Sequence, residues 1–507
     1  MSFRPRINKL ASETAVYGVS SVFGRLINFL LFPFYSNVFA PDVYGPVIVV
    51  YAAFVFLNVI YQYGMEAAYL KYAANAPDTD EKTKTFSTAI WSLFLTASVF
   101  SACIFFFKAP VGGILGLEPG HFTLLNYMAG ILMLDTLMVV PYAELRLQNQ
   151  PWRFATVRIA GIVVNVGLNL VFILVMDMGI EAIFLANLIA SGMSLVLLSP
   201  AFTQNFRFQF SQSRLREMLH FGLPFVPGGL GYALSERVNI FFLERMPRER
   251  ILELYGSDPA VAALADKAAT EGNAIYAEFI VGAYGGMIKL AIILALVVQM
   301  FRYAWQPFFL QHADDDDASS LFARVFTLFT AALLVVYLAV AFLALELVSI
   351  PLPGDRFLIA PSYWIGLKVI PIALLGYVFQ GWYYHFSAGA YIQNKTKFFV
   401  LSTLVGSVVA LVLNILLVPQ YGMVAAAWAT ASSYAVMAVI LLSLVQRAYP
   451  VPYEWGRVLS LVAGAVILFF LWDAFEVLQI WWVEFLLLSG FAVLAVYITG
   501  VKRLGRN

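Results

Sequence analysis

The sequence predicts an all-α polytopic membrane protein with about fourteen transmembrane helices. Of its 507 residues, 61% are hydrophobic and only 12% are charged, and the mean hydropathy is +0.81. Soluble domains carry about 25% charged residues, so the composition excludes a soluble globular protein. Apolar runs of about 20 residues, the length that crosses a bilayer, recur along the chain. The predicted spans are 12–39, 44–70, 84–107, 120–144, 154–176, 180–200, 219–245, 279–304, 320–347, 364–390, 397–417, 422–444, 455–474 and 479–500.

The first apolar run follows a basic N-terminus and superficially resembles a signal peptide. The run is about 26 residues long, whereas the apolar region of a signal peptide has about 7 to 15 residues. No small-residue cleavage site precedes Pro41. We therefore expect this segment to be retained as the first transmembrane helix.

Cysteine and histidine usage argues against a disulfide or a bound metal. Cys103 is the one cysteine, and the four histidines are too scattered for a zinc or haem site. We expect no cofactor, with H⁺ or Na⁺ as candidate coupling ions. The net charge is +1 and the basic residues form no stripe, so no nucleic-acid partner is predicted. The histidines are His121, His220, His312 and His385.

Lysine and arginine are distributed unevenly over alternate connections between the predicted spans. One side carries 21 of the 31 residues and the other side carries 7, while Arg25, Arg237 and Lys289 fall within spans. Loops rich in lysine and arginine lie on the cytoplasmic side of membrane proteins. We therefore predict that both termini are cytoplasmic.

The two halves of the chain share an ordered set of sequence matches. Because six spans is an even number, two six-span copies insert with the same orientation, as parallel repeats. We predict an N-terminal six-helix bundle at 1–201, a cytoplasmic connector at 202–218, a C-terminal six-helix bundle at 219–445, and two further transmembrane helices with a cytoplasmic tail at 446–507. The matches are Tyr44-Gly45 with Tyr284-Gly285, Ala73 with Ala313, Gln148-Asn149 with Gln393-Asn394, and Leu168-Asn169 with Leu413-Asn414.

One connection interrupts the repeat. Residues 246–277 form a long external insertion where the first bundle has only residues 40–43. Asp258 and Pro259 suit an N-cap and a first helical position, so a short amphipathic helix is predicted at 259–269. The insertion is either a passive excursion of the chain or an element that gates the outer side or binds sugar.

Two arginines occupy matching places in apolar runs of the two bundles. Arg25 lies in GRLINFLLF and Arg237 in ERVNIFFLE. A guanidinium at bilayer depth costs at least about 2.5 kcal/mol, which indicates a shared polar interior. Arginine suits phosphate oxygens, so we expect an anionic substrate there; pairing with a carboxylate such as Glu236 or Glu244 is the alternative. Lys289 is a third candidate cation, and extension of its ammonium to the outer surface is equally open.

Three acidic residues lie within or at the ends of predicted spans and are candidates for ion coupling or charge pairing. Asp135 lies about four turns into the fourth span, whereas Glu66 and Glu144 lie near inner ends. An ionisable residue at membrane depth is a functional hypothesis by default. For Glu66 and Glu144, an interfacial pair with Lys71 or Arg146 is equally open.

Aromatic residues are a weaker signal. Trp305, Trp382, Tyr383 and Tyr384 lie in the second bundle at places where they could stack on sugar rings. Tryptophan and tyrosine also concentrate at the membrane boundary without any ligand, which is the alternative. No nucleophile with a base and an orienting group, and no glycine-rich phosphate loop, is found, so we do not expect an enzyme.

Four blocks of sequence resemble a known family: LASETAVYGVSSVFGRLINFLLFPFYSNVFAPDVYG, YQYGMEAAYLKYA, PYAELRLQNQPWRFA and MFRYAWQPFFLQHA. In combination, over about residues 8–445, they resemble the polysaccharide or O-antigen (lipid-linked oligosaccharide) flippases of Wzx type in the MATE-like MOP exporter superfamily. The long segment 246–277 departs from the pattern of that family. The resemblance implies a two-lobed core of twelve helices with two added helices.

The resemblance also implies a function. Such a protein moves undecaprenyl-diphosphate-linked oligosaccharide from the cytoplasmic to the periplasmic leaflet of the bacterial cytoplasmic (inner) membrane by alternating access, for O-antigen and lipopolysaccharide biosynthesis. Its cationic cavity corresponds to Arg25, Arg237, Lys289 and Arg302. Membrane lipids and the polysaccharide polymerase and chain-length machinery are the implied partners.

Other functions remain open on the sequence alone. A peptidoglycan-precursor flippase or a MATE-type drug exporter would belong to the same superfamily. A membrane-embedded glycan polymerase or ligase is a remote alternative, because the one long loop, 246–277, contains no histidine. A purely structural scaffold would not explain buried arginines.

Overall fold

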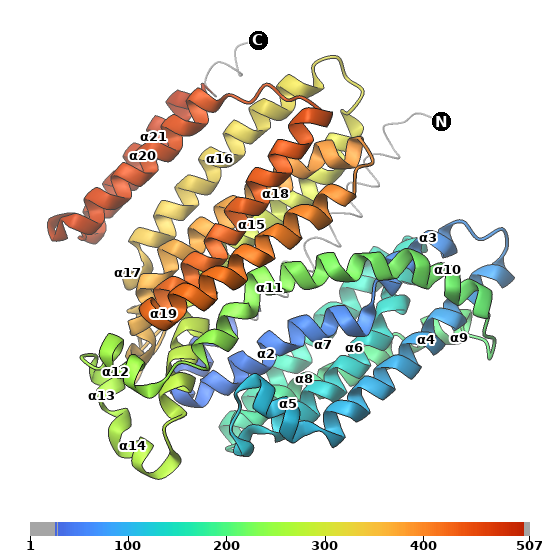
Figure 1. Cartoon of the computed structure of the whole chain (residues 1–507), viewed down its shortest axis with the longest axis horizontal. Coiled ribbons are helices and arrows are strands. Elements are labelled where there is room, and N and C mark those ends of the chain that lie inside the picture. Colours follow the sequence, from blue (N-terminus) through green and yellow to red (C-terminus); the bar gives the residue numbers. More distant parts are fainter. Residues whose placement is uncertain (1–25, 28, 501–507) are drawn as a thin grey trace. The chain divides into compact units, whose positions relative to one another are not determined.

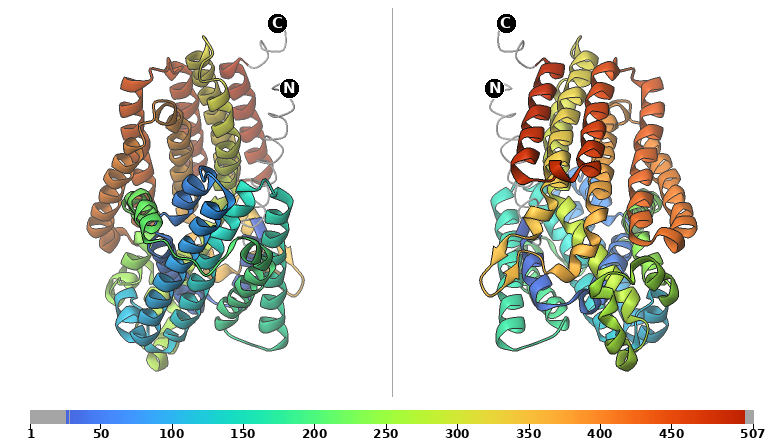
Figure 2. Two further views of the ribbon diagram at one scale, coloured as in Figure 1. Left: turned by 90° about the vertical axis from the view of Figure 1, so that its right-hand side faces the viewer. Right: turned by 90° about the vertical axis from the view of Figure 1, so that its left-hand side faces the viewer.

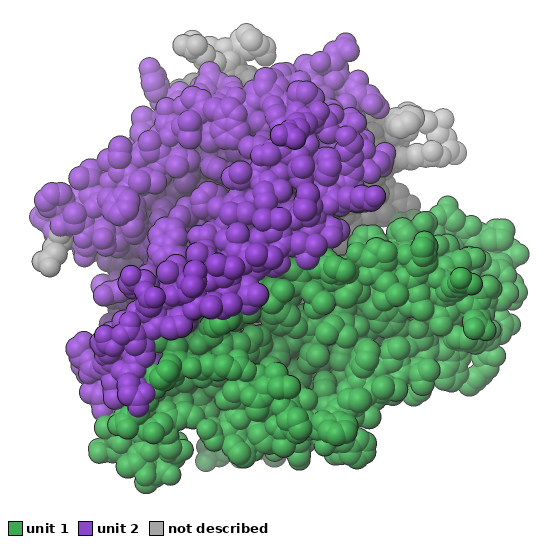
Figure 3. Space-filling model, viewed as in Figure 1, with its two compact units in different colours: residues 1–31, 42–248, 264–282 green, residues 32–41, 249–263, 283–507 purple. Residues whose placement is uncertain are grey.

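The computed structural model describes residues 26–27 and 29–500, and within them it is helical apart from one short hairpin (Figure 1). Contacts divide the chain into two compact units (Figure 3). Unit 1 contains the described residues up to Leu31 together with Asp42–Arg248 and Leu264–Gly282. Unit 2 contains Phe32–Pro41, Glu249–Ala263 and the rest of the chain from Ala283. Arg25 lies outside the described residues.

Unit 1 is a bundle in which α6 is the central helix. Its face carries a long stripe of buried residues, and α3, α4, α7 and α8 pack on it. Two helix starts are fixed by side-chain caps, because Asp78 accepts from the amide of Glu81 (2.8 Å) and Ser211 from that of Arg214 (3.3 Å). The elements of unit 1 are α2 (Pro41–Gln62), α3 (Met65–Ala74), α4 (Thr79–Phe106), α5 (Lys108–Leu115), η1 (Pro119–His121), α6 (Thr123–Leu147), α7 (Pro151–Leu170), the π-helix η2 (Val171–Val175), α8 (Glu181–Leu197), α9 (Ser199–Asn205), α10 (Gln212–Gly222), η3 (Leu223–Phe225), α11 (Val226–Leu243) and α14 (Leu264–Glu271).

Unit 2 is built around α16 and α18, with α20 and α21 packed as a pair on α16 (Figure 2). The long helix α15 begins in residues of unit 1 and continues in unit 2 from Ala283. The further elements are the helix Phe29–Val38, α12 (Arg248–Tyr255), α13 (Pro259–Ala262), α15 (Ile275–Gln311), α16 (Ala318–Phe342), α17 (Ala344–Val348), β1 (Pro351–Leu352), β2 (Arg356–Phe357), η4 (Pro361–Val369), α18 (Ile370–Ile392), α19 (Lys397–Ala448), α20 (Trp455–Ala474), η5 (Glu476–Leu478) and α21 (Trp481–Thr499).

The described helices account for most of the predicted spans. Ten of them are long and apolar enough to cross a membrane, or eleven if Glu181–Leu197 and Ser199–Asn205, bent by 41°, form one span. The predicted spans 397–417 and 422–444 are joined in α19, where Gly422 breaks the helical backbone with φ 56°. The seventh predicted span corresponds to η3 and α11, which fall outside this group of ten, and much of the first lies outside the described residues.

The predicted repeat has a structural counterpart in two helix ends. Asn149 and Asn394 both adopt positive φ, 51° and 53°. At each turn, three successive backbone amides donate to carbonyls four, three and five residues earlier in the chain. These amides are those of residues 148–150 in the first half and 393–395 in the second. Left-handed asparagine at such a C-terminus closes the last helical turn. The two halves therefore end the corresponding helix in the same way.

A second match concerns a buried asparagine in each half. Asn169 and Asn414 are fully buried, and each donates from its Nδ2 to the carbonyl four residues earlier, at 2.8 and 2.7 Å. The boundaries of the two compact units differ from those of the predicted bundles, because α11 belongs to unit 1 although the prediction assigned it to the C-terminal bundle. The division into two six-helix bundles therefore stays a prediction.

The insertion 246–277 is helical, as predicted in part. Asp258 caps α13 by accepting from the amide of Ala260 (2.8 Å), with Pro259 in the first turn. The single helix predicted at 259–269 is instead two, α13 and α14, and α12 precedes them.

α12 also makes specific contacts within unit 2. The Tyr255 hydroxyl accepts from the amide of Met423 (2.8 Å), and Arg250 Nε donates to the carbonyl of Pro419 (2.8 Å). These are backbone groups at the break of α19, which would otherwise lack partners. The contacts make α12 a cap on this helix break, which a passive excursion of the chain would not provide.

Candidate functional site

Two candidate cations from the sequence lie on α15, at separate places. The Lys289 ammonium lies 4.7 Å from the centroid of the Phe32 ring, and the Arg302 guanidinium lies 4.7 Å from that of Tyr384. Thirteen residues of helix separate the two cations by about 20 Å along the axis and about 140° around it. The structure therefore does not bring Lys289 and Arg302 into one site.

Arg302 and Tyr384 are the two predicted site residues that unit 2 brings together. Arg302 is exposed, Tyr384 is half-buried, and Arg302 Nη1 lies 3.5 Å from the Tyr384 hydroxyl. A guanidinium held over an aromatic ring keeps its outer edge open to an anion. An aromatic ring and a cation together suit a negatively charged, sugar-containing ligand.

The other aromatic candidates are less accessible. Trp305 is 3% exposed, stacks on His385 with centroids 4.5 Å apart, and donates from Nε1 to the carbonyl of His385 (3.1 Å). Tyr383 is buried and Trp382 half-buried, with the Trp382 ring edge-on to Phe326 at 5.5 Å. Trp305 thus belongs to the aromatic core of unit 2, and sugar stacking by these three residues stays a prediction.

Arg237 lies in α11 of unit 1. Its Nη2 lies 3.2 Å from Glu236 Oε1, and the two side chains are 36% and 22% exposed. The sequence left open whether Arg237 meets a substrate or a carboxylate; in the structure the neighbouring carboxylate is in contact. Glu244, the other competitor considered, lies at the C-terminal end of the same helix.

Glu66 and Arg146 form an ion pair between α3 and α6. An interfacial ion pair with Arg146 was one of the two pairings that the sequence left open for Glu66. Lys71, the other candidate partner, instead lies over the Phe221 ring at 3.9 Å. Both members of the pair are partly exposed, so its stabilising contribution is about 0 to 1 kcal/mol.

Glu144 is fully buried and has three partners. The Tyr69 hydroxyl donates to Oε2 (2.5 Å), Gln148 Nε2 donates to Oε1 (2.6 Å), and Lys82 Nζ lies 2.6 Å from Oε1. Both carboxylate oxygens are therefore satisfied, as a buried charge requires. The partner is Lys82, which neither sequence alternative named.

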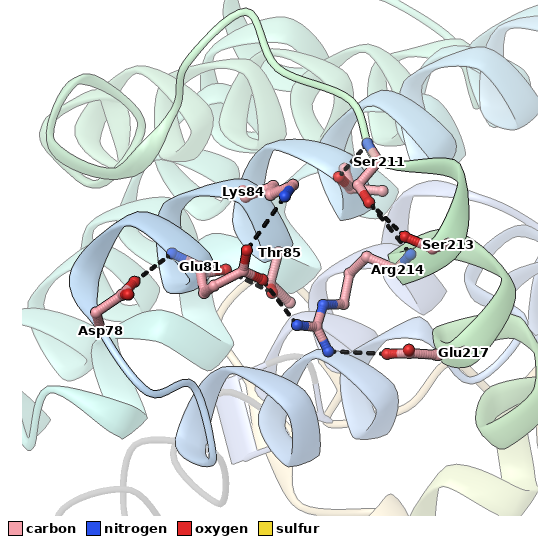
Figure 4. Close-up of polar contacts among 9 residues, drawn as sticks. Asp78, Glu81, Lys84, Thr85, Ser211, Ser213, Arg214 and Glu217 are labelled. Carbon is pink, nitrogen blue, oxygen red and sulfur yellow. Dashed lines mark hydrogen bonds and ion pairs between the residues drawn. The ribbon is translucent and has the colours of Figure 1, made fainter.

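A third group links the predicted connector to α4 (Figure 4). Arg214 of α10 lies between Glu81 and Glu217, with Nη2 and Nη1 each 2.8 Å from a carboxylate oxygen. The hydrogen bond to Glu81 raises the pKa of Arg214 above its usual value. Lys84 also contacts Glu81 (3.1 Å). We call the end of unit 1 that carries these pairs and those of Glu66 and Glu144 the paired end.

Asp135 lies nine residues before Glu144 on α6 and has a different environment. It accepts a hydrogen bond from Ser191 of α8 (2.7 Å), and within the described ranges no ion pair of Asp135 is found. A role in ion coupling for Asp135 stays a prediction.

Sequence reasoning missed a group of ionisable residues at the opposite end of α6. Lys267 of α14 pairs with the buried Asp42 at the start of α2, and His121 lies 3.2 Å from Glu278 of α15. Burial lowers the pKa of Lys267, but the hydrogen bond and charge of Asp42 outweigh it, so the net shift is upward. We call this end of unit 1, together with Glu244, the acidic end.

The comparisons with known proteins agree with this architecture. The solved structure of a lipid II flippase MurJ in an inward closed conformation superposes with a TM-score of 0.75 at 13% identity, covering 97% of this chain and 100% of that one. An inward-facing MATE multidrug resistance transporter of the MOP superfamily gives 0.63 at 11% identity, covering 84% and 94%. The Vibrio cholerae MATE transporter VcmN gives 0.55 at 14% identity, covering 87% and 97%.

The chain therefore has the fold of the MATE and MurJ transporters, and the MATE-like helical membrane fold predicted from the sequence is confirmed. No curated protein matches the chain. The family model described as polysaccharide biosynthesis protein matches residues 10–312, more than half of the sequence. The chain belongs to the polysaccharide biosynthesis protein family.

Proposed function

We propose that this protein flips undecaprenyl-diphosphate-linked oligosaccharide from the cytoplasmic to the periplasmic leaflet of a bacterial inner membrane by alternating access. The observation that carries the proposal is the family match over residues 10–312 together with a transporter fold over nearly the whole chain. Lipid-linked glycan is the substrate that a membrane transporter of a polysaccharide pathway has to move. Polysaccharide polymerase and chain-length machinery would act on the product.

Electrostatics supports this direction of transport. The diphosphate carries negative charge, and export from a negative-inside cell gains about 2.3 kcal/mol per charge per 100 mV. Arg302 beside Tyr384 and Lys289 beside Phe32 supply cations along α15, and Arg237 and Arg25 are the further candidates. Membrane potential alone could therefore drive the step, with H⁺ or Na⁺ as candidate additions.

The lysine and arginine distribution supports one orientation. The paired end contains Lys82, Lys84, Arg146 and Arg214, which all fall on the cation-rich side of the sequence count. That side corresponds to the cytoplasm. In our proposal, the paired end faces the cytoplasm and the acidic end faces the periplasm.

Complementation tests the substrate. The gene would be expressed in a panel of strains that lack an O-antigen flippase, a peptidoglycan-precursor flippase or a drug exporter. Restored surface glycan in the first strain alone is the expected result. Rescue of only one of the other strains would overturn the proposed substrate.

Variants in the first strain test the site. Arg25→Ala should abolish glycan display at a normal protein level, and Arg302→Ala should reduce it about tenfold, since a charge-assisted contact contributes about 1.5 to 3 kcal/mol. Arg356→Ala, on the exposed strand β2, is the matched control and should leave display unchanged. Undiminished display with Arg25→Ala or Arg302→Ala would remove that residue from the site.

A peptidoglycan-precursor flippase is the second candidate. The observation that favours it is the MurJ structure, which covers 97% of this chain. At 13% identity that likeness carries the fold alone. Viability of a strain depleted of its lipid II flippase separates the two candidates.

A further inference from the structure

Three ionisable side chains meet at the acidic end of unit 1, and none of them belongs to the proposed substrate site. Glu244 follows α11, Glu278 lies in the first turn of α15, and His121 ends η1. His121 Nδ1 lies 3.2 Å from Glu278 Oε1. Three segments of the chain, distant in sequence, therefore bring one imidazole and two carboxyl groups to one place.

Both carboxyl groups are buried by close packing. Glu244 and Glu278 are each 7% exposed. Gly45 of α2 lies so close to the backbone of Glu278 that a Cβ there would overlap its carbonyl group. Gly116, with φ +87°, lies against the methylene groups of Glu244, where a Cβ would come within 2.8 Å of Cγ. Close packing of the neighbouring backbone therefore surrounds both residues.

One carboxyl oxygen of Glu244 has no hydrogen-bond partner in the described part of the chain. That oxygen, Oε2, is buried. Arg245, the neighbouring cation, donates instead to the carbonyls of Phe241 (3.0 Å) and Ile114. A buried ionised carboxylate without a partner costs several kcal/mol, and in practice such a group takes up a proton.

The acidic groups around the site favour the same outcome, and Arg245 opposes it. Glu278 and Glu118 act on Glu244 as negative charges, and Glu118, Glu181 and Glu278 act on His121. Lys267 is engaged by Asp42 and Glu271. The acidic groups that act on Glu244, His121 and Lys267 outnumber the cations. The facing groups are Asp42 (α2), Glu118 (just before η1), His121 (η1), Glu181 (α8), Glu244 and Arg245 (just after α11), Lys267 and Glu271 (α14) and Glu278 (α15).

We propose that Glu244, Glu278 and His121 form a proton-binding site at the acidic end. A protonated imidazole can neutralise Glu278, and a second proton held by Glu244 removes the remaining buried charge. The ligand is a proton, because the described residues contain no group of three His, Cys, Asp or Glu side chains arranged to hold a metal ion. This site differs from Asp135, Glu66 and Glu144, the acids that the sequence indicated.

The site joins elements that flank the insertion. Glu244 precedes α12 in the chain, and Glu278 follows α14. Loss of the proton at high pH leaves two buried negative charges whose repulsion separates the end of α11 from the start of α15. Proton binding therefore holds this junction closed, and deprotonation loosens it.

Infrared difference spectroscopy of the full-length protein in lipid bilayers, in H₂O and D₂O, tests the site without any substrate. Titration from pH about 5.5 to about 9 should remove a protonated-carboxyl carbonyl band of about one group per chain. Glu244→Gln and, separately, Glu278→Gln should each abolish that pH-dependent band. Glu271→Gln, an exposed carboxyl of α14 in the same region, should retain it.

The outcomes are decisive in either direction. Absence of a titrating carboxyl band in the natural protein, or a full band in both Glu244→Gln and Glu278→Gln, would overturn the proposal. If one variant fails to fold, the other still reports, because Glu244 and Glu278 act on each other as negative charges and the loss of either removes that repulsion. The proposed flippase activity can fail in complementation while this site is confirmed, and the reverse also holds.

Discussion

The two ends of unit 1 carry similar acidic side chains but neutralise them in different ways. At the paired end, Glu144 is in contact with Lys82, and Glu81 with Arg214. At the acidic end, Glu244 is equally inaccessible, yet the nearest cation bonds to backbone carbonyls. Lysine and arginine are concentrated on one side of a membrane protein, so carboxylates at that end have more cationic partners than carboxylates at the other. At the cation-poor end Lys267 pairs with Asp42, and in our proposal Glu244 depends on a proton instead.

The largest expected effect breaks the packing of the acidic end. Gly45→Ala should destabilise the protein by about 3 kcal/mol or more, because the new methyl group overlaps the backbone of Glu278. Thermal unfolding in detergent measures the change. Gly113→Ala, where no atom lies within 4 Å, is the control and should be neutral or stabilising. Equal stability of Gly45→Ala and the natural protein would contradict the close contact.

The next effect removes the cation of the paired end. Lys82→Ala should cost about 2 kcal/mol, less than the range of about 3 to 5 for fully buried pairs because Lys82 is 27% exposed. Glu144 would remain buried with only neutral partners. Lys84→Ala is the matched control on the same helix and should cost less than about 1 kcal/mol, since both Lys84 and Glu81 reach water. Equal losses for the two variants would show that burial of Glu144 does not matter.

A third variant should act in the opposite direction at the acidic end. An unfolded glutamate ionises near pH 4.3, whereas we propose that folded Glu244 keeps its proton to higher pH. The folded state then binds more protons, so the stability of the natural protein falls as pH rises. Glu244→Gln removes this dependence and should raise stability by about 1 to 2 kcal/mol at pH about 8.5, and by much less at pH about 5.5. Thermal unfolding of Glu244→Gln and of the natural protein at both pH values measures the difference. A variant less stable than the natural protein at pH about 8.5 would contradict the proposed difference between the two ends.

The smallest effect tests redundancy at the paired end. Tyr69→Phe removes one hydrogen bond to Glu144, which keeps Lys82 and Gln148. A cost of about 1 kcal/mol is expected. Tyr72→Phe, whose hydroxyl makes an exposed 3.3 Å bond to the carbonyl of Glu217, should be silent. A cost of several kcal/mol for Tyr69→Phe would mean that Lys82 does not compensate.

Hydropathy and motif resemblance were sufficient for the fold and the family. Apolar runs of bilayer length mark helices directly, because only fully bonded backbone is tolerated in hydrocarbon. The break predicted between the spans 397–417 and 422–444 coincides with Gly422, whose φ of 56° suits glycine. The Asp258 cap was likewise readable from sequence.

Ionic partners were only partly predictable. Glu66 and Arg146 are 80 residues apart, and the sequence could name Arg146 only as one of two options. Lys82 as the partner of Glu144 depends on the approach of α4 to α6, which periodicity does not encode.

The acidic end escaped prediction for the same reason. His121, Glu244 and Glu278 come from different connections, and each looks unremarkable in its own segment. One signal was available: Glu244 and Glu278 flank the insertion on the side with few lysines and arginines. Acids at apolar boundaries on that side have fewer cations available, and this pattern indicates groups that can need another means of neutralisation.

The matched asparagine turns also locate a difference in length between the two halves. The offset between equivalent positions is 240 residues at Ala73 and Ala313 but 245 at Asn149 and Asn394. Between these points the second half is therefore five residues longer than the first. The later half carries β1 and β2 in that interval, in an exposed connection that tolerates such changes. The difference in length precedes a helix end that has the same geometry in both halves.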